Sequence, residues 1–248
     1  MGNLAIEVCR LSKRFNSVVA VDGISFSVPQ GSTCALLGGN GAGKTTTLAM
    51  LLGLLLPTSG SIRILGVDMV RNRYPALSRM NFTSPYVDLP HRLTVKQNLD
   101  VYARLYGVRH RSARLRTLAE SFDLETLMDR AYGSLSAGQR TRVALAKALL
   151  NEPEVLLMDE PTASLDPASA DTIRTLLKTY QEQSGATVLL ASHNMQEVER
   201  LCDRVLMLKQ GRIVDQDTPA MLVQKYGRES LEQVFIDIAR DQDRRSAY

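Results

Sequence analysis

The feature that most limits which folds this chain can adopt is a glycine-rich stretch between a short apolar run and a helical pattern. Residues 34–37 indicate a buried strand, and residues 45–55 indicate a helix that ends before Pro57. Between them the sequence matches a loop that binds phosphate, because glycines let successive backbone N–H groups surround an anion. The simpler alternative is an ordinary turn with an exposed lysine. The strand and helix on either side favour the phosphate site, with Lys44 on phosphate oxygens and the Thr45 hydroxyl on Mg²⁺.

A pair of carboxylates follows a second apolar run. Residues 155–158 are all apolar, and Asp159 and Glu160 come directly after them. In a parallel sheet, the carboxyl ends of the strands are where ligands bind. Asp159 is suited to holding Mg²⁺, and Glu160 to orienting and deprotonating an attacking water. An acidic strand end that caps a helix is the alternative, which the preceding phosphate loop disfavours.

A third segment, residues 135–139, precedes a helical pattern that runs to residue 150. Ser136 can cap this helix together with Gln139, three residues later. The same helix start would also favour an anion, because the positive end of its dipole lies there. The residues alone leave both interpretations open.

Taken together, these segments resemble a known family. In order and spacing, residues 38–46, 135–139, 156–162, 164–166 and 192–193 are similar to the Walker A, signature, Walker B, D-loop and H-loop motifs of ABC ATPases. The resemblance extends over residues 8–216. It implies ATP as substrate, Mg²⁺ as cofactor, and two cassettes that pair head to tail.

The resemblance also implies a role for each matching residue. Glu160 and His193 would be catalytic, with His193 contacting the γ-phosphate and holding the water and Glu160 in line. A lone histidine after an apolar strand is otherwise usually structural, and Phe15, which would stack on adenine, could instead be a core aromatic. Across the dimer, ATP would meet Ser136, Gly138, Gln139 and Asp166. Within one chain it would be held by Gly38, Gly39, Asn40, Gly41, Ala42, Gly43, Lys44, Thr45 and Thr46.

The chain departs from the family pattern in three places. Gly39 stands where proline is usual, and Ala137 replaces the first glycine of the signature. The Q-loop glutamine is missing, because residues 62–96 contain no glutamine. Ser84 could offer an oxygen to Mg²⁺ through a water, but its reach is shorter.

The alternation of patterns predicts an α/β fold. We expect a P-loop three-layer core with a mainly parallel sheet, an N-terminal antiparallel β portion with strands at 5–9, 18–21 and 24–28, and an inserted helical subdomain. The whole chain, residues 1–248, would form a single ABC ATPase domain. Its parts would be an ATP-binding core (1–90 and 151–216), a helical insert with the signature segment (91–150) and a helical tail (217–248).

Composition adds limits on location and partners. The excess of 30 basic over 26 acidic residues is too small to indicate nucleic acid, and we expect no direct nucleic-acid partner. Three separated cysteines without a CxxC pair favour a reducing compartment. The longest apolar stretch, residues 48–56, is only about half a bilayer-spanning helix. These limits favour the cytosol and no membrane-spanning segment, and the resemblance to ABC ATPases then implies a peripheral protein at the cytoplasmic face of the cell membrane.

The resemblance narrows the expected function further. Residues 53–66 and 227–239 are similar to the ABC-2 group, which mostly exports drugs, lipids or polysaccharides. The chain would be the ATP-hydrolysing subunit of such an exporter, working as a homodimer or paired cassette on an integral membrane permease. The alternatives are an importer ATPase, an ABC ATPase that acts on nucleic acid or in translation, and a P-loop kinase.

Overall fold

A computed structural model describes residues 3–85, 88–163 and 165–245. By its internal contacts the chain divides into two compact units. The first comprises Met1–Arg73 and Leu189–Tyr248, and the second comprises Tyr74–Val188.

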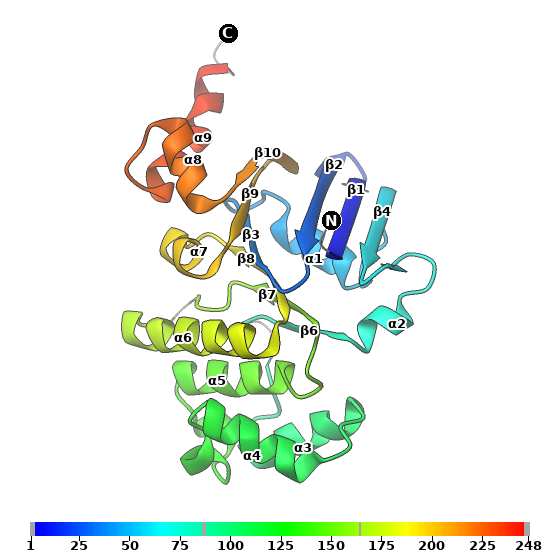
Figure 1. Ribbon diagram of the computed structural model, residues 1–248, viewed down its shortest axis with the longest axis vertical. Helices are drawn as coiled ribbons and strands as arrows, with labels where there is room; N and C mark the ends of the chain where they lie inside the picture. Colours follow the sequence, from blue (N-terminus) through cyan, green and yellow to red (C-terminus); the bar gives the residue numbers. More distant parts are fainter. Residues whose placement is uncertain (1–2, 86–87, 164, 246–248) are drawn as a thin grey trace. The chain divides into compact units, whose positions relative to one another are not determined.

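The first unit contains an antiparallel sheet in the order β2-β1-β4-β5 (Figure 1). Its strands are β1 (Leu4–Phe15), β2 (Val18–Pro29), β4 (Ser59–Ile64) and β5 (Val67–Asp68). In β4, Ile62 and Ile64 are buried while their neighbours are exposed, which is the alternation of a sheet with one covered face. The expected strands at 18–21 and 24–28 are one strand, because Gly23 takes a φ of 65° and lets β2 continue through an irregularity.

The first unit also contains strands of a second sheet, most of them parallel and buried. β3 (Thr33–Leu37) pairs in parallel with β9 (Arg204–Lys209), and β10 (Arg212–Asp217) pairs antiparallel with β9. β8 (Thr187–Ser192) follows β3 in the order of strands. All residues of β3 and β8 are buried, as expected for strands covered on both faces. The strands predicted from apolar runs at 34–37, 187–191 and 205–208 are thus confirmed.

The helices of this unit are α1 (Lys44–Leu51), α7 (Met195–Leu201), α8 (Pro219–Tyr226) and α9 (Leu231–Arg245). The prediction that the first helix reaches residue 55 is wrong. Gly53 takes the left-handed conformation, with a φ of 66°, and its N–H bonds to the Met50 carbonyl. This is a common way for a helix to end. The helical tail is two helices, because Gly227 ends α8 in the same conformation.

The second unit combines two parallel strands with a group of helices. β6 (Met80–Thr83) pairs with β7 (Val155–Asp159). Figure 1 shows α3 beside α4, and α5 beside α6. Phe122, Leu99 and Val143 are fully buried and supply apolar side chains to the core of this unit. The helices are α2 (Tyr74–Leu77), α3 (Val95–Leu105), α4 (Arg111–Ser121), α5 (Ala137–Ala148) and α6 (Pro167–Ser184), with 3₁₀ turns at Glu125–Leu127 and Tyr132–Ser134.

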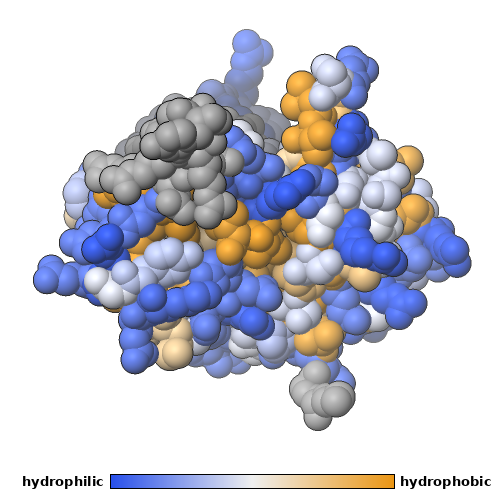
Figure 2. Space-filling model, turned by 90° about the horizontal axis from the view of Figure 1, so that it is seen from above, coloured by the Kyte–Doolittle hydropathy of each residue, from blue (hydrophilic) through white to orange (hydrophobic). Residues whose placement is uncertain are grey.

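Nowhere in the described ranges does a helix combine the length and apolar character that crossing a bilayer demands. The face seen in Figure 2 is mainly hydrophilic, with apolar side chains in smaller groups between the polar ones.

Candidate active site

The glycine-rich loop of the first unit connects β3 to α1 and leaves no room for a Cβ at two of its positions. Gly43 has a φ of 101°, and a Cβ built there would lie 2.6 Å from the Ala20 carbonyl oxygen. A Cβ at Gly38 would lie 2.6 Å from the Leu208 carbonyl oxygen. The backbone of the loop therefore passes directly against its neighbours, and a side chain at either position would displace it.

Lys44 begins α1 and is only 7% exposed. Its Nζ donates hydrogen bonds to the carbonyl oxygens of Gly38 (2.6 Å) and Gly39 (3.2 Å), so the ammonium group lies against the loop. No side chain caps α1 at Gly43. The positive end of the helix and the ammonium are thus gathered at one loop, as binding of a phosphate requires. Thr45, next in the chain, is exposed.

Phe15, at the end of β1, is 46% exposed, which argues against a core aromatic. Lys13 Nζ lies 5.1 Å from the centre of its ring and also donates to the Leu56 carbonyl. The ring therefore retains an accessible surface on which a base can stack.

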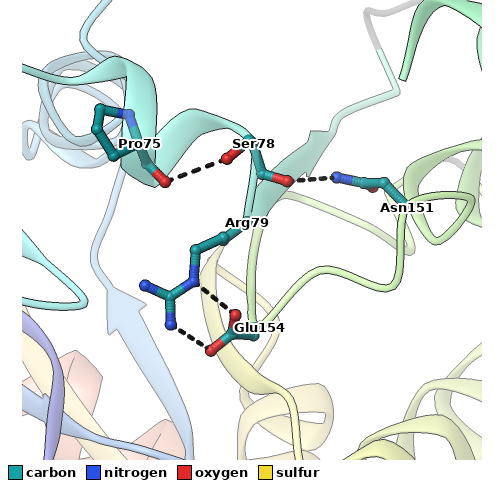
Figure 3. A network of polar contacts seen from close by, with 5 residues as sticks. All are labelled: Pro75, Ser78, Arg79, Asn151 and Glu154. Carbon is teal, nitrogen blue, oxygen red and sulfur yellow. Dashed lines mark hydrogen bonds and ion pairs between the residues drawn. The ribbon is translucent and has the colours of Figure 1, made fainter. Parts of the chain in front are cut away.

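A polar network in the second unit joins the residues that come just before β6 and β7 (Figure 3). Arg79 Nε and one terminal nitrogen each donate to one oxygen of Glu154, both at 2.6 Å. The backbone N–H of Glu154 donates to the Arg79 carbonyl (2.8 Å), and Asn151 Nδ2 donates to that of Ser78 (3.4 Å). The guanidinium holds the pKa of Glu154 below its ordinary value. The start of β6 is therefore tied to the start of β7.

The pairing of β6 with β7 also determines which residues adjoin at the other end of the two strands. Thr83 pairs with Met158, so the next residues, Ser84 and Asp159, come at adjoining strand ends. Both are buried, at 6% and 4% exposed. A hydroxyl and a carboxylate oxygen are thereby brought to the same edge of the unit, and both are ligand types that Mg²⁺ accepts.

Glu160 lies just beyond the strand in an unusual backbone conformation. Its φ is 51°, in the left-handed region, which costs an ordinary residue roughly 1 to 2 kcal/mol. Its carbonyl accepts a hydrogen bond from the Ala163 N–H (3.0 Å), and its side chain is half-buried. The turn therefore directs the Glu160 side chain away from the path that a continuing strand would give it. Such strain is concentrated at functional sites.

The segment before α5 forms the capping box that its sequence allowed. Gln139 N–H donates to Ser136 Oγ (3.3 Å), and Ser136 N–H donates to Gln139 Oε1 (3.0 Å). Gly138 has a packing role as well, because a Cβ there would lie 2.9 Å from Ser169 Oγ on α6. Ser136 is exposed and remains accessible to a ligand.

Asp166 caps α6 by accepting hydrogen bonds from the N–H groups of Ala168 (3.1 Å) and Ser169 (3.0 Å). Hydrogen bonds from the Ser169 side chain and backbone lower the pKa of this carboxyl. Ser164, in the same predicted segment, lies outside the described residues.

His193 follows β8 in the first unit and is exposed. The turn that carries it is held by Ser192, which belongs to the predicted H-loop segment, and by Asn194 and Glu197, which the sequence analysis did not single out. Buried Ser192 donates from Oγ to Glu197 Oε2 (2.6 Å) and accepts from the Asn194 N–H (3.0 Å). Asn194 in turn caps α7 by accepting from the Glu197 N–H (3.2 Å). The spacing of Asn194 and Glu197 was the signal of a capping pair.

Comparison with known proteins identifies the family. Residues 21–163 match the family model described as ABC transporter. The chain is 39% identical over 221 residues to the Nod factor export ATP-binding protein I of Burkholderia pseudomallei (strain 1710b), covering 88% of this chain and 72% of that protein.

Two solved structures are similar throughout. An ATP-binding subunit of an ABC transporter has a TM-score of 0.85 at 28% identity, covering 95% of this chain and 99% of that one. The second is cbiO1 from Clostridium perfringens, part of the ABC transporter complex cbiONQ, with a TM-score of 0.81 at 30% identity, covering 90% and 92%. The predicted α/β P-loop fold is confirmed by these neighbours. The chain therefore belongs to the ABC transporter family, as an ATP-binding subunit and ATPase.

Proposed function

We propose that this chain binds an integral membrane permease and powers an ABC-2 type exporter by binding and hydrolysing ATP. The observation that carries the proposal is the phosphate-binding geometry at the start of α1, where Lys44 lies on the Gly38 and Gly39 carbonyls. The export direction is supported by the name of the relative from Burkholderia pseudomallei. In this proposal residues 1–248 form one ATPase domain, peripheral to the cytoplasmic face of the membrane.

In the proposed site, the backbone N–H groups of residues 38–46 surround the phosphates, and Lys44 contacts the β and γ oxygens. Phe15 stacks on the adenine, which its exposed ring supports. Thr45, Asp159 and, through a water, Ser84 hold Mg²⁺. The fit rests on donor type, because hydroxyl and carboxylate oxygens are what Mg²⁺ prefers, and Ser84 and Asp159 come at adjoining strand ends. The bound metal supplies positive charge for the phosphate oxygens.

Hydrolysis then depends on two side chains of this chain. Glu160 accepts a proton from the attacking water, and its left-handed backbone supports a side-chain direction set for that purpose. His193 holds the water and the γ-phosphate in line. The fixed turn around Ser192 and Glu197 supports this role, because it restricts where the imidazole can lie.

A second cassette completes the site in this proposal. Ser136, Gly138 and Gln139 of one copy contact the γ-phosphate bound by the other, and Asp166 links the two sites. The accessible Ser136 at the positive end of α5 supports this arrangement. ATP-driven closure of the two cassettes then moves the permease between its inward and outward states.

The permease would dock on the helical insert. On α3, Val101 and Leu105 lie one turn apart and are 44% and 72% exposed, which supports an apolar contact there. The test is recovery of the chain with membranes that contain an ABC-2 type permease, for the wild type and Leu105→Asp. Lys178→Asp, at an exposed position of α6, is the matched control.

We expect the wild type and Lys178→Asp to be recovered with the permease and Leu105→Asp to be lost, while all three bind ATP. Recovery with ribosomes or DNA in place of the membrane would contradict the transporter role. Net uptake by vesicles carrying the complex would contradict export.

A further inference from the structure

A pocket behind the glycine-rich loop has no role in the proposed chemistry. Its volume is about 280 Å³, and all of its lining residues belong to the first unit. Loop residues 39–42 form one wall, and the end of β9 with the following turn, residues 208–210, forms another. Phe235, Ile238 and Ala239 of α9 close it. The C-terminal helix thus faces the loop across this pocket.

Several contacts hold α9 in this position. Leu231 and Val234 are fully buried, and the Leu231 N–H donates to Glu199 Oε1 (2.9 Å). Lys209 Nζ donates to the carbonyls of Ile238 and Ala239, the latter at 3.0 Å. Lys209 is the last residue of β9 and directly follows Leu208, whose carbonyl oxygen lies beside Gly38. The end of β9 therefore supports both the glycine-rich loop and α9.

The loop residue that faces the Phe235 ring is the second glycine, Gly39. A Cβ built on Gly39 would lie 4.0 Å from Phe235 Cζ, an ordinary van der Waals distance, with no other heavy atom as near. Glycine has more backbone freedom to lose than any other residue when it is ordered. The ring of Phe235 borders the pocket into which this part of the loop could otherwise move, so it limits the loop's alternative conformations.

We infer that α9 is a positioning element for ATP binding, with Phe235 bracing residues 39–42 in the conformation that receives the phosphates. The inference rests on the proposed role of residues 38–46. Removing the Phe235 side chain increases the conformational entropy of residues 39–42 in the free protein. Because nucleotide binding must then order this loop, the affinity for nucleotide falls. Restricting one glycine changes an equilibrium by about two- to fivefold.

The experiment compares Phe235→Ala with Ile236→Ala, its neighbour on α9, which is exposed and does not line the pocket. Four quantities are measured: the Kd for MgADP, the KM for ATP, the kcat for ATP, and amide hydrogen exchange of residues 39–42 without nucleotide. For Phe235→Ala we expect Kd and KM to rise about two- to fivefold with kcat little changed. Exchange should increase at residues 39–42 but not in β3. Ile236→Ala should match the wild type.

Two further variants separate a positioning role from a structural one. Phe235→Leu keeps an apolar contact and should restore most of the affinity. Gly39→Ala, combined with Phe235→Ala, should restore part of it, because alanine restricts the loop and its Cβ has room. If Phe235→Ala does not fold, Lys209→Met tests the same brace by removing the donor to the end of α9.

Unchanged Kd and exchange in Phe235→Ala would overturn the positioning role, and so would tighter binding, which would mean that α9 opposes nucleotide. Lys44→Ala distinguishes this failure from failure of the site itself. If Lys44→Ala also binds MgADP normally, residues 38–46 are not the phosphate site. If Lys44→Ala binds MgADP weakly while Phe235→Ala binds it like the wild type, residues 38–46 are the phosphate site but Phe235 does not position them.

Discussion

Ser136 offers a sharp test, because its capping role and its proposed contact with the γ-phosphate respond differently to substitution. Ser136→Ala removes the acceptor for the Gln139 N–H, one of the two reciprocal bonds of the capping box. Loss of such a cap costs about 1 kcal/mol, which lowers Tm by about 2–4 °C in a chain of this size. Ser136→Asp retains a capping oxygen and places negative charge at the positive end of α5, so stability should stay within about 0.5 kcal/mol of wild type.

The ATPase assay separates the two roles. A hydrogen bond to a charged group contributes about 1.5–3 kcal/mol, so Ser136→Ala should lower kcat/KM about 10- to 100-fold. Ser136→Asp should lose at least as much activity, because its carboxylate repels the γ-phosphate. Both variants are measured at a protein concentration that supports dimers, beside thermal unfolding. A fully active Ser136→Asp with wild-type Tm would show that Ser136 only caps α5.

Three further predictions concern stability and reactivity. Arg79→Met should cost only about 0.5–1 kcal/mol by urea unfolding, because its pair with Glu154 is partly exposed. Since the folded-state pKa of Glu154 is lowered, this contribution is present above its ordinary pKa of 4.5 and is lost as pH falls through the folded value. An equal cost at pH 3 and pH 7 would contradict the assignment. Iodoacetamide at pH 8 should label exposed Cys9 in the native protein but not Cys34 or Cys202, because burial raises the pKa of Cys34 to about 12 and also raises that of Cys202; mass spectrometry should find all three labelled only after unfolding. Phe122→Ala should destabilise the protein by about 3–5 kcal/mol in urea, since Phe122 is 1% exposed, and a loss below about 1 kcal/mol would show that this core is not well packed.

The sequence predicted the loop and the buried strands well, for local reasons. Glycine spacing and short apolar runs bounded by turns determine where β3, β7 and β8 lie. The capping box at Ser136 is equally local, because it needs only a glutamine three residues later.

Other features depend on contacts that no local pattern reveals. Residues 52–55 keep an apolar character that continues the α1 pattern, yet Gly53 ends the helix. The adjoining positions of Ser84 and Asp159 follow from strand register, to which Arg79 and Glu154 contribute from the far end of the same strands. The approach of Phe235 to Gly39 joins segments almost 200 residues apart.

The most direct test of the proposed mechanism compares the wild type with Glu160→Gln. ATP hydrolysis is measured in each sample, and light scattering on the same samples measures ATP-dependent dimerisation. We expect hydrolysis by Glu160→Gln to fall about a hundredfold or more, as for loss of a general base, while the variant binds ATP and accumulates as a dimer. Equal hydrolysis by the two proteins would show that Glu160 is not the base. An ATP-bound Glu160→Gln that stays monomeric would contradict the head-to-tail mechanism.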